Sequence, residues 1–345
     1  MRVVRGWRVV AFLDLAVKSY HQPRKAVDRL YDLVLYAPRR SVGFGLIYMI
    51  YAVQRLWCRD YIVVSPAVPR RLYGFWKLAM LAGIRLVPEG TELGPKFGMP
   101  LARMRHFDRT WDGGARPGYV NGRCTDISKS HVDRIFRRVF GYSTKIDPTQ
   151  FRGQAVIKPE ENFAGGGAFV ECPIAEGEVE PGMIYQVLVD NQVARDCVEE
   201  YRASIIGGRI TDVMIKYRDV ARRLKGRGSG GSKGSSLHSA EQVFTARQIR
   251  QIEDFCEQIG LDFGELDVLP DFDEARLYIL DANKTPSVMV HGNSFRVARF
   301  RLLMQRARAF SAHFRSRTAG SRSGVRDEIA VEGLAGRTGF EAALE

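Results

Sequence analysis

The acidic stretch from Phe263 to Pro286 constrains the fold more than any other part of the sequence. Two runs of residues that favour β-strands, Glu265–Leu269 and Leu277–Asp281, flank a polar turn that begins at Pro270. We predict that these runs pair as an antiparallel hairpin. Because successive strand side chains point to opposite faces, one face of the hairpin is expected to be apolar and the other acidic.

The register of this hairpin brings like charges together. A turn centred near Glu274 places Asp267 opposite Asp281 and Glu265 opposite Asn283, all on one face. Directly opposed like charges destabilise a sheet, so we expect a compensating cation. Mg²⁺ prefers carboxylate and amide oxygens, which favours a metal site here; a solvated acidic face is the alternative. The other face is expected to carry Leu266, Val268, Tyr278, Leu280 and Ala282.

The composition is that of a globular protein. With 345 residues, 45% of them hydrophobic and 26% charged, the chain can bury a large core and form two or three subdomains. A formal net charge of +13 favours anionic partners, which include nucleotides, anionic lipids, acidic saccharides and nucleic acid. The five cysteines are scattered without CxxC spacing, which indicates a reduced cytoplasmic protein without a zinc site.

The first 60 residues are basic, rich in aromatic side chains and predicted to be mainly helical. The apolar run Val42–Val53 is too short to span a bilayer as a straight helix, and no secretion signal is evident. Two interpretations remain open. The segment is a packed helical subdomain, or it lies on the anionic inner face of a membrane.

The middle of the chain is predicted to alternate strands and helices. In order, we expect a strand at 61–66, a helix at 71–81, a strand at 84–88, a connecting loop at 89–123 and a helix from about 128 to 141. The first three elements form a βαβ-like unit. Lys129 lies in the first turn of the later helix, where Ser128 and Ser130 are capping residues.

A glycine-rich turn follows between two predicted strands, Ala155–Pro159 and Ala168–Val170. The backbone N–H groups of such a turn can hold phosphate, and Lys158 at the strand end adds a positive charge. A flexible hairpin with a solvated lysine is the alternative.

The second half is predicted to continue with strands and a long helix. We expect strands at 183–190, 201–206 and 209–217, a basic Gly- and Ser-rich segment at 222–236, helices at 245–259 and 295–314, and a disordered tail at 315–345. The basic segment is either a mobile lid over phosphates or a flexible connection.

This order of elements resembles the ATP-grasp superfamily, in particular carboxylate–amine ligases such as D-alanine:D-alanine ligase. The resemblance covers about Asp126 to Pro286 and is most specific at Ile-Leu-Asp-Ala-Asn-Lys-Thr-Pro, residues 279–286. It implies an α/β (α+β) protein with an ATP-grasp fold of two α+β subdomains. The implied segments are a helical N-terminus (1–60), a small α/β domain (61–123), the two subdomains (124–189 and 190–314) and a tail (315–345).

The resemblance also implies ATP and Mg²⁺, with Mn²⁺ as an alternative ion. It assigns the metal to Asp267, Asp281 and Asn283, and the phosphates to Lys129, Lys158, Gly165, Gly166 and Gly167. It assigns adenine to Gln186, Val187 and Val189, and the ribose to Asp190 or Glu200. The chain departs from the pattern at Glu265, where some ligases carry an arginine. Arg202, Arg218 or Lys216 are candidates to supply the missing catalytic charge.

The activity implied is ATP-dependent ligation, in which a carboxylate is phosphorylated and an amine or similar nucleophile displaces the phosphate. Two alternatives remain: a kinase-like phosphotransferase on the same fold, and a non-catalytic nucleotide-binding protein at the membrane surface. We do not expect nucleic-acid binding, because no aromatic and basic residues are interleaved as in a known module. The segment Asp126–Asp147 resembles ATP-grasp proteins associated with surface-polysaccharide synthesis, which implies an envelope-precursor substrate.

Overall fold

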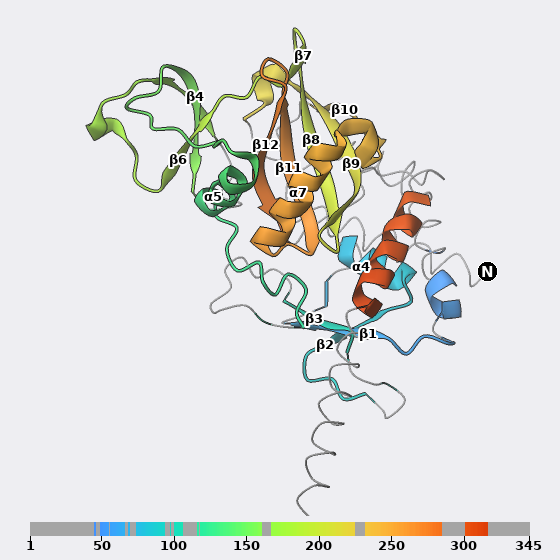
Figure 1. The fold of residues 1–345 in the computed structure, drawn as a ribbon. Helices are drawn as coiled ribbons and strands as arrows, with labels where there is room; N and C mark the ends of the chain where they lie inside the picture. Colours follow the sequence, from blue (N-terminus) through green and yellow to red (C-terminus); the bar gives the residue numbers. More distant parts are fainter. Residues whose placement is uncertain are drawn as a thin grey trace, which may run out of the picture. The chain divides into compact units, whose positions relative to one another are not determined.

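The computed structural model describes residues 45, 49–54, 56–65, 68–69, 74–93, 97, 100–105, 116, 118–160, 167–224, 232–284 and 301–316. The chain divides into two compact units, one made of residues 1–103 and 290–345 and the other of Met104–Met289. Strands and helices are both present, so the predicted α+β class is confirmed (Figure 1). The finer division into five segments stays a prediction.

The first unit contains the βαβ unit that the sequence predicts. Its elements are β1 (Tyr61–Ser65), α4 (Gly74–Leu81) and β2 (Arg85–Pro88), and β1 pairs with β2 in parallel. A third strand, β3 (Ala102–Arg105), gives the sheet order β2-β1-β3, which corrects the expectation of a connecting loop there. The described part of the last helix, 301–316, packs its Phe310 edge-on to Phe75 of α4 at 5.2 Å.

The second unit begins with α5 and a small antiparallel sheet. The elements are α5 (Lys129–Phe140), β4 (Gly153–Pro159), β5 (Ala168–Cys172), the short helix η2 (Glu176–Glu178) and β6 (Met183–Val187). The sheet order is β5-β4-β6. Gly141 ends α5 in the left-handed conformation at φ 86°, as the sequence predicts for this helix.

A larger antiparallel sheet completes this unit, in the order β10-β9-β8-β11-β12 with β7 paired to β8. Its strands are β7 (Gln192–Ala194), β8 (Cys197–Ile206), β9 (Arg209–Asp219), β10 (Ser232–His238), β11 (Phe263–Asp271) and β12 (Arg276–Asn283). The helices are η3 (Val220–Arg222), α6 (Ala240–Val243) and α7 (Ala246–Ile259). Strand β10 corrects the expectation of a lid or flexible connection for residues 232–236, while residues 225–231 lie outside the described part.

Helix α7 has local signals at both ends. The hydroxyl of Thr245 accepts a hydrogen bond from Gln248 N, and Gly260 ends the helix at φ 77°. A Cβ at Gly260 would lie 2.6 Å from the carbonyl carbon of Arg123, so both the conformation and the space require glycine. These signals are in the sequence, and the predicted helix is confirmed.

Helices α5 and α7 cover the apolar face of the large sheet (Figure 1). Val132, Ile135 and Phe136 of α5 and Ile252, Phe255, Cys256 and Ile259 of α7 are buried in the same core as the sheet residues Tyr201, Ala203, Ile205, Val213, Leu266, Val268 and Ile279. The helices therefore close one face, and the other face of the same strands carries the polar side chains.

The hairpin of β11 and β12 has the predicted register at its acidic end. Asp267 lies opposite Asp281 and Glu265 opposite Asn283. A register shift after Asp267 then places Ile279, not Leu280, opposite Val268. The strands also extend through Pro270 and Asp271, so the turn begins later than predicted, and Ala275 adopts a positive φ of 53° within it.

All five cysteines are free thiols, and Cys124 and Cys256 are buried. Burial raises the pKa of the Cys124 thiol to about 12, so this group stays protonated and unreactive at neutral pH. None of the described helices has both the length and the apolar character needed to cross a bilayer.

Candidate active site

The polar face of the large sheet gathers residues from three strands in one row. Arg202 of β8 lies opposite Asp267 of β11, which lies opposite Asp281 of β12. The adjacent row on the same face runs from Ser204 through Glu265 to Asn283, because strand side chains repeat every second residue. The candidate metal ligands Asp267, Asp281 and Asn283 therefore share a face.

Arg202 joins the two acidic residues of β11. Its Nε lies 3.1 Å from Asp267 Oδ1 and its Nη2 lies 3.2 Å from Asp267 Oδ2. Its Nη1 lies 3.3 Å from Oε2 of Glu265, whose side chain is only 2% exposed. These carboxylates raise the pKa of Arg202 in spite of its burial, so the guanidinium stays charged. Arg202 is thus one compensating cation for the acidic hairpin, supplied by the protein itself.

A second cationic group lies beside this row. Glu200 faces Lys216 across β8 and β9, and its carboxylate accepts a contact of 2.8 Å from Arg218 Nε. Burial raises the pKa of Glu200. Burial and the neighbouring charges of Arg202 and Arg218 lower the pKa of Lys216 to about 8. All three candidate catalytic cations, Arg202, Lys216 and Arg218, thus lie on this face, and two of them are held in ion pairs.

Two lysines from other elements lie near Asp281, and one of them also lies near Asp267. Lys158 comes from β4 of the small sheet and Lys129 from the first turn of α5. Burial lowers the pKa of Lys158, and the charge of Lys129 lowers it further, while Asp281 and Asp267 act in the opposite direction. Burial likewise lowers the pKa of Lys129 against the charges of Asp281 and Glu160. The structure therefore brings these two lysines near each other and near Asp281.

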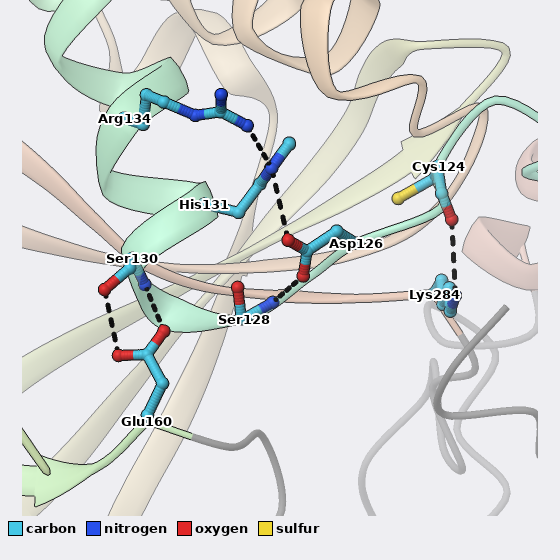
Figure 2. Close-up of polar contacts among 8 residues, drawn as sticks. All are labelled: Cys124, Asp126, Ser128, Ser130, His131, Arg134, Glu160 and Lys284. Atoms are coloured by element: carbon cyan, nitrogen blue, oxygen red, sulfur yellow. Dashed lines mark hydrogen bonds and ion pairs between the residues drawn. The ribbon is translucent and has the colours of Figure 1, made fainter. Parts of the chain in front are cut away.

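The start of α5 is bonded to the end of β4 by a residue that sequence reasoning did not single out as a site residue. Glu160 accepts hydrogen bonds from Ser130 N at 2.8 Å and Ser130 Oγ at 2.9 Å (Figure 2). Its backbone oxygen accepts one from Lys129 N at 3.3 Å. Ser128, the residue before the helix, makes no side-chain capping bond, so Glu160 caps the helix from another element.

Asn121 holds the strand ends that carry the site. Its Nδ2 donates to the backbone oxygens of Phe263 at 2.7 Å and Lys284 at 3.1 Å, and its Oδ1 accepts from Phe263 N at 2.9 Å. A Cβ at Gly264 would lie 2.5 Å from Asn283 O, so only glycine allows this approach. Lys284 in turn donates from Nζ to Cys124 O at 3.2 Å (Figure 2).

The candidate adenine segment contains one buried acceptor. Gln186 is 2% exposed, and its Nε2 donates to Thr144 Oγ1 at 3.0 Å. Thr144 Oγ1 itself donates to Asp133 Oδ1 at 2.7 Å, which fixes the direction of both bonds. The Oε1 atom of Gln186 is buried without a hydrogen-bond partner in the described structure. Gln186 is opposite Val156, two residues before Lys158, so it shares a face with that lysine.

The neighbouring backbone groups are partly engaged. Val187 N donates to Thr144 O at 2.8 Å, and Val189 O accepts from Arg223 Nη2 at 2.8 Å. Asp190 is exposed, and its backbone oxygen accepts a bond from Phe272 N. The roles of Val187, Val189, Asp190 and Glu200 toward a nucleotide stay predictions.

Of the three glycines assigned to phosphate, Gly165 and Gly166 lie outside the described residues. Gly167 is described, and a Cβ there would lie 3.2 Å from Cγ of Lys158. The absence of a side chain at position 167 therefore leaves room for the side chain of Lys158.

The donor set suits a hard divalent cation. Two carboxylates and one amide supply oxygen ligands from adjacent strands, and Oδ1 of Asp281 is a buried atom. Asp267 is 40% exposed and retains coordination sites beyond its two bonds to Arg202. Among the described residues, no group of three or more His, Cys, Asp or Glu side chains is placed to hold a metal, so a metal here needs the Asn283 amide or substrate oxygens.

Comparisons with known proteins give structural similarity only. No family model matches the chain, and no curated protein matches it. The chain is similar in structure to the ATP-grasp ligase PsnB in a complex with a phosphomimetic precursor variant, Mg and ADP, with 13% identity, 75% and 98% of the two chains covered, and a TM-score of 0.46.

Two further similarities are of the same order. A D-alanine–D-alanine ligase from Bacillus anthracis matches with 12% identity, coverage of 76% and 99%, and a TM-score of 0.42. A RimK domain ATP-grasp protein from Sphaerobacter thermophilus matches with 12% identity, coverage of 74% and 98%, and a TM-score of 0.39.

Proposed function

We propose that this protein is an ATP- and Mg²⁺-dependent ligase, which activates a carboxylate as an acylphosphate and joins it to an amine or similar nucleophile. The observation that carries the proposal is that Lys129 and Lys158, from two different elements, both lie near Asp281, and that Lys158 also lies near Asp267, which is paired with Asp281. Burial and mutual repulsion lower the pKa of Lys158. A polyanion bound between the lysines would relieve that repulsion.

The arrangement of charges in the site suits a ligand that carries both a metal ion and phosphates. The cations of the site are Lys129, Lys158, Arg202, Lys216 and Arg218, and its carboxylates are Glu160, Glu200, Glu265, Asp267 and Asp281. Mg-ATP offers a partner to each kind of group. Its metal would meet the carboxylates and its phosphates the lysines.

The metal would be held by Asp267, Asp281 and Asn283, whose oxygen donors suit Mg²⁺ or Mn²⁺. When bound, the ion would neutralise charge on the transferred and leaving phosphates. Arg202 orients Asp267 through two contacts, and its third nitrogen, Nη1, contacts Glu265. We therefore assign Arg202 the orientation of the metal-binding carboxylate, and Lys216 and Arg218 the neutralisation of phosphate charge.

The base of the nucleotide is assigned to the segment around Gln186. Its buried Oε1 faces no donor of the described protein, and the 6-amino group of adenine would supply one. Val187 and Val189 would line the base, Asp190 or Glu200 would accept from the ribose, and Gly165, Gly166 and Gly167 would approach the phosphates.

The reaction would proceed in two displacements. A carboxylate oxygen of the substrate attacks the γ-phosphorus, the bond to the β–γ bridging oxygen breaks, and ADP leaves. The amine then attacks the acyl carbon, the bond to the phosphate oxygen breaks, and inorganic phosphate leaves as the amine loses a proton. Phosphoryl transfer depends mainly on positioning and charge neutralisation, and the lysines and arginines of this site provide both.

We also propose a substrate class and a cellular location for the protein. An envelope precursor as substrate, a cytoplasmic location and peripheral contact with an anionic membrane are consistent with the net charge of +13 and the basic first 60 residues.

The test is thermal stabilisation by Mg-ATP, followed by ADP release in the presence of mixed carboxylate and amine substrates. We expect Mg-ATP to raise the melting temperature of the wild-type protein, and Asp281→Ala/Asn283→Ala to remove the Mg²⁺-dependent part of that rise. Lack of any nucleotide effect on the wild-type protein would contradict the proposal. Nucleotide binding that is unchanged in the double variant would remove the metal role.

A further inference from the structure

The contact between Glu160 and the start of α5 bears directly on the two lysines. Lys158 is two residues before Glu160, and Lys129 is one residue before Ser130. The carboxylate of Glu160 accepts from Ser130 N at 2.8 Å and from Ser130 Oγ at 2.9 Å (Figure 2). The backbone of Lys129 donates to Glu160 O at 3.3 Å. Three hydrogen bonds therefore join the two lysine-bearing elements next to the lysines.

The backbone of Glu160 is itself anchored. Its N–H donates to Gly182 O at 2.9 Å, immediately before β6, so the residue is tied to the small sheet on one side and to α5 on the other. Glu160 is also half-buried, which restricts its side chain. Bonds from a carboxylate to a backbone N–H at a helix N-terminus are charge-assisted and stronger than neutral ones.

We call these three hydrogen bonds the Glu160 clamp; they act against the electrostatic repulsion between the two ammonium groups. Lys129 and Lys158 repel each other, and both lose hydration where they lie. The acidic strands attract each lysine but do not connect β4 to α5. The hydrogen bonds of Glu160 connect the two elements directly beside the like charges.

We propose that Glu160 is a positioning residue of the nucleotide site, which holds Lys129 and Lys158 together for the phosphates by bonding Ser130. This inference rests on the proposed ATP site and deepens it. Glu160 does not contact the phosphates, since its negative charge would oppose them. It acts through the helix that carries Lys129.

The direction in which Glu160→Ala changes the affinity for nucleotide distinguishes this positioning role from a simple effect of charge. Glu160→Ala removes a negative charge near a polyanion site, so charge alone predicts tighter nucleotide binding. The clamp predicts weaker binding. We expect Glu160→Ala to weaken Mg-AMPPNP binding about tenfold, the change for ~1.4 kcal/mol, because the lysines are no longer held in place.

Three other variants complete the design. Glu160→Gln removes the same charge but keeps an amide oxygen for Ser130 N, so we expect it to bind within about threefold of wild type. Ser130→Ala removes one bond without a charge change and should fall between wild type and Glu160→Ala. Glu178→Ala is the matched control, because Glu178 accepts from Ala175 N at 3.0 Å within the same part of the chain and is exposed.

The measurement is isothermal titration calorimetry with Mg-AMPPNP on the full chain, with circular dichroism melts of each variant. Weaker binding in Glu160→Ala and Ser130→Ala, with Glu160→Gln and Glu178→Ala near wild type, supports the clamp. Binding by Glu160→Ala that equals or exceeds wild type overturns it, as does equal weakening in Glu160→Gln. Failure of the wild-type protein to bind any nucleotide would instead count against the proposed function.

If Glu160→Ala does not fold, Ser130→Ala decides the question, because it removes only a hydroxyl from the helix start. Binding by folded Ser130→Ala that equals wild type then overturns the clamp.

Discussion

The guanidinium of Arg202 holds the carboxylate of Asp267 through two contacts, of 3.1 Å and 3.2 Å, on directly opposed positions of β8 and β11. The third nitrogen of the same group reaches the buried Glu265 at 3.3 Å. One arginine thus pairs with a carboxylate that is assigned to the metal and with a second carboxylate that is buried.

Loss of this arginine should destabilise the fold. We expect Arg202→Met to lower the free energy of unfolding by ~3 kcal/mol, because it removes the ion pair that Arg202 makes with the buried Glu265 carboxylate. Adding Glu265→Gln should recover part of that loss. Urea unfolding of the single and double variants measures the coupling, and strictly additive effects would contradict the ion-pair interpretation.

The carboxylate of Asp281 should determine the requirement for magnesium. We expect Asp281→Asn to weaken the Mg²⁺ dependence of AMPPNP binding at least about tenfold, because one anionic oxygen donor is lost. Asp273→Asn is the control, since Asp273 is exposed in the turn of the same hairpin. Titration of Mg²⁺ at fixed nucleotide checks this, and equal curves for the two variants would rule out the metal role of Asp281.

Lys158 should strengthen nucleotide binding and lower the thermal stability of the protein without nucleotide. Its pKa is lowered by burial and by Lys129, so the protonated form penalises the folded state at neutral pH, and this penalty disappears as the pH approaches the ordinary lysine pKa. We therefore expect Lys158→Met to melt at a higher temperature than wild type at pH 7 and to lose stabilisation by Mg-ATP. Lys145→Met, at an exposed lysine, should change neither. Thermal melts with and without nucleotide measure both effects.

Lys216 should make nucleotide binding sensitive to pH. Its pKa is about 8, so the free site loses this positive charge as the pH rises through that value. We expect the affinity for Mg-AMPPNP to fall between pH 7 and pH 9 and binding near pH 8 to take up protons, because a bound polyanion favours the charged lysine. Calorimetry in buffers of different ionisation enthalpy measures this uptake. The uptake should be absent in Lys216→Met, and its persistence there would assign it to another group.

Gln186 should select the base. Its Oε1 accepts from a 6-amino group but opposes the 6-oxo group of inosine, so we expect ATP to bind about tenfold more tightly than ITP, a difference of ~1.4 kcal/mol. Gln186→Leu should reduce that ratio toward one. Gln154→Leu, at an exposed position of β4, is the control. Competition of ATP and ITP against a labelled nucleotide measures the ratio, and an unchanged ratio in Gln186→Leu would place the base elsewhere.

Local signals explain why much of the second unit was predictable. Thr245 and Gly260 mark the ends of α7, and the apolar stripe between them has helical spacing. The alternation in β11 and β12 placed Asp267 opposite Asp281 correctly, because one apolar face excludes the register shifted by one residue.

Other elements depend on their neighbours. Strand β10 is rich in Gly and Ser, and its own residues do not favour a strand; it forms because β9 offers an unpaired edge. The register shift after Asp267 leaves no clear mark in the sequence. The free backbone hydrogen-bonding groups at the edge of β9 can pair with a segment whose residues do not favour a strand, so the neighbouring strand determines the structure of β10.

The residues of the candidate site also differ in whether their role follows from a local pattern or from a distant partner. Lys158 and the acidic pair were proposed as candidates from the sequence, because each lies in a local pattern of strand, turn and charge. Glu160, Arg202 as the partner of Glu265, and the bond from Gln186 to Thr144 were not, since their partners are 30, 63 and 42 residues away.

Among the described residues, the sequence by itself determined the longer helices, most of the strands and the pairing of the acidic hairpin, because periodicity, caps and turns act over a few residues. Only the tertiary structure decided which charges meet. Ion pairs and hydrogen bonds between distant segments depend on how sheets and helices pack, and in this protein that packing brings two lysines from other elements near the arginine and the two aspartates of the polar sheet face.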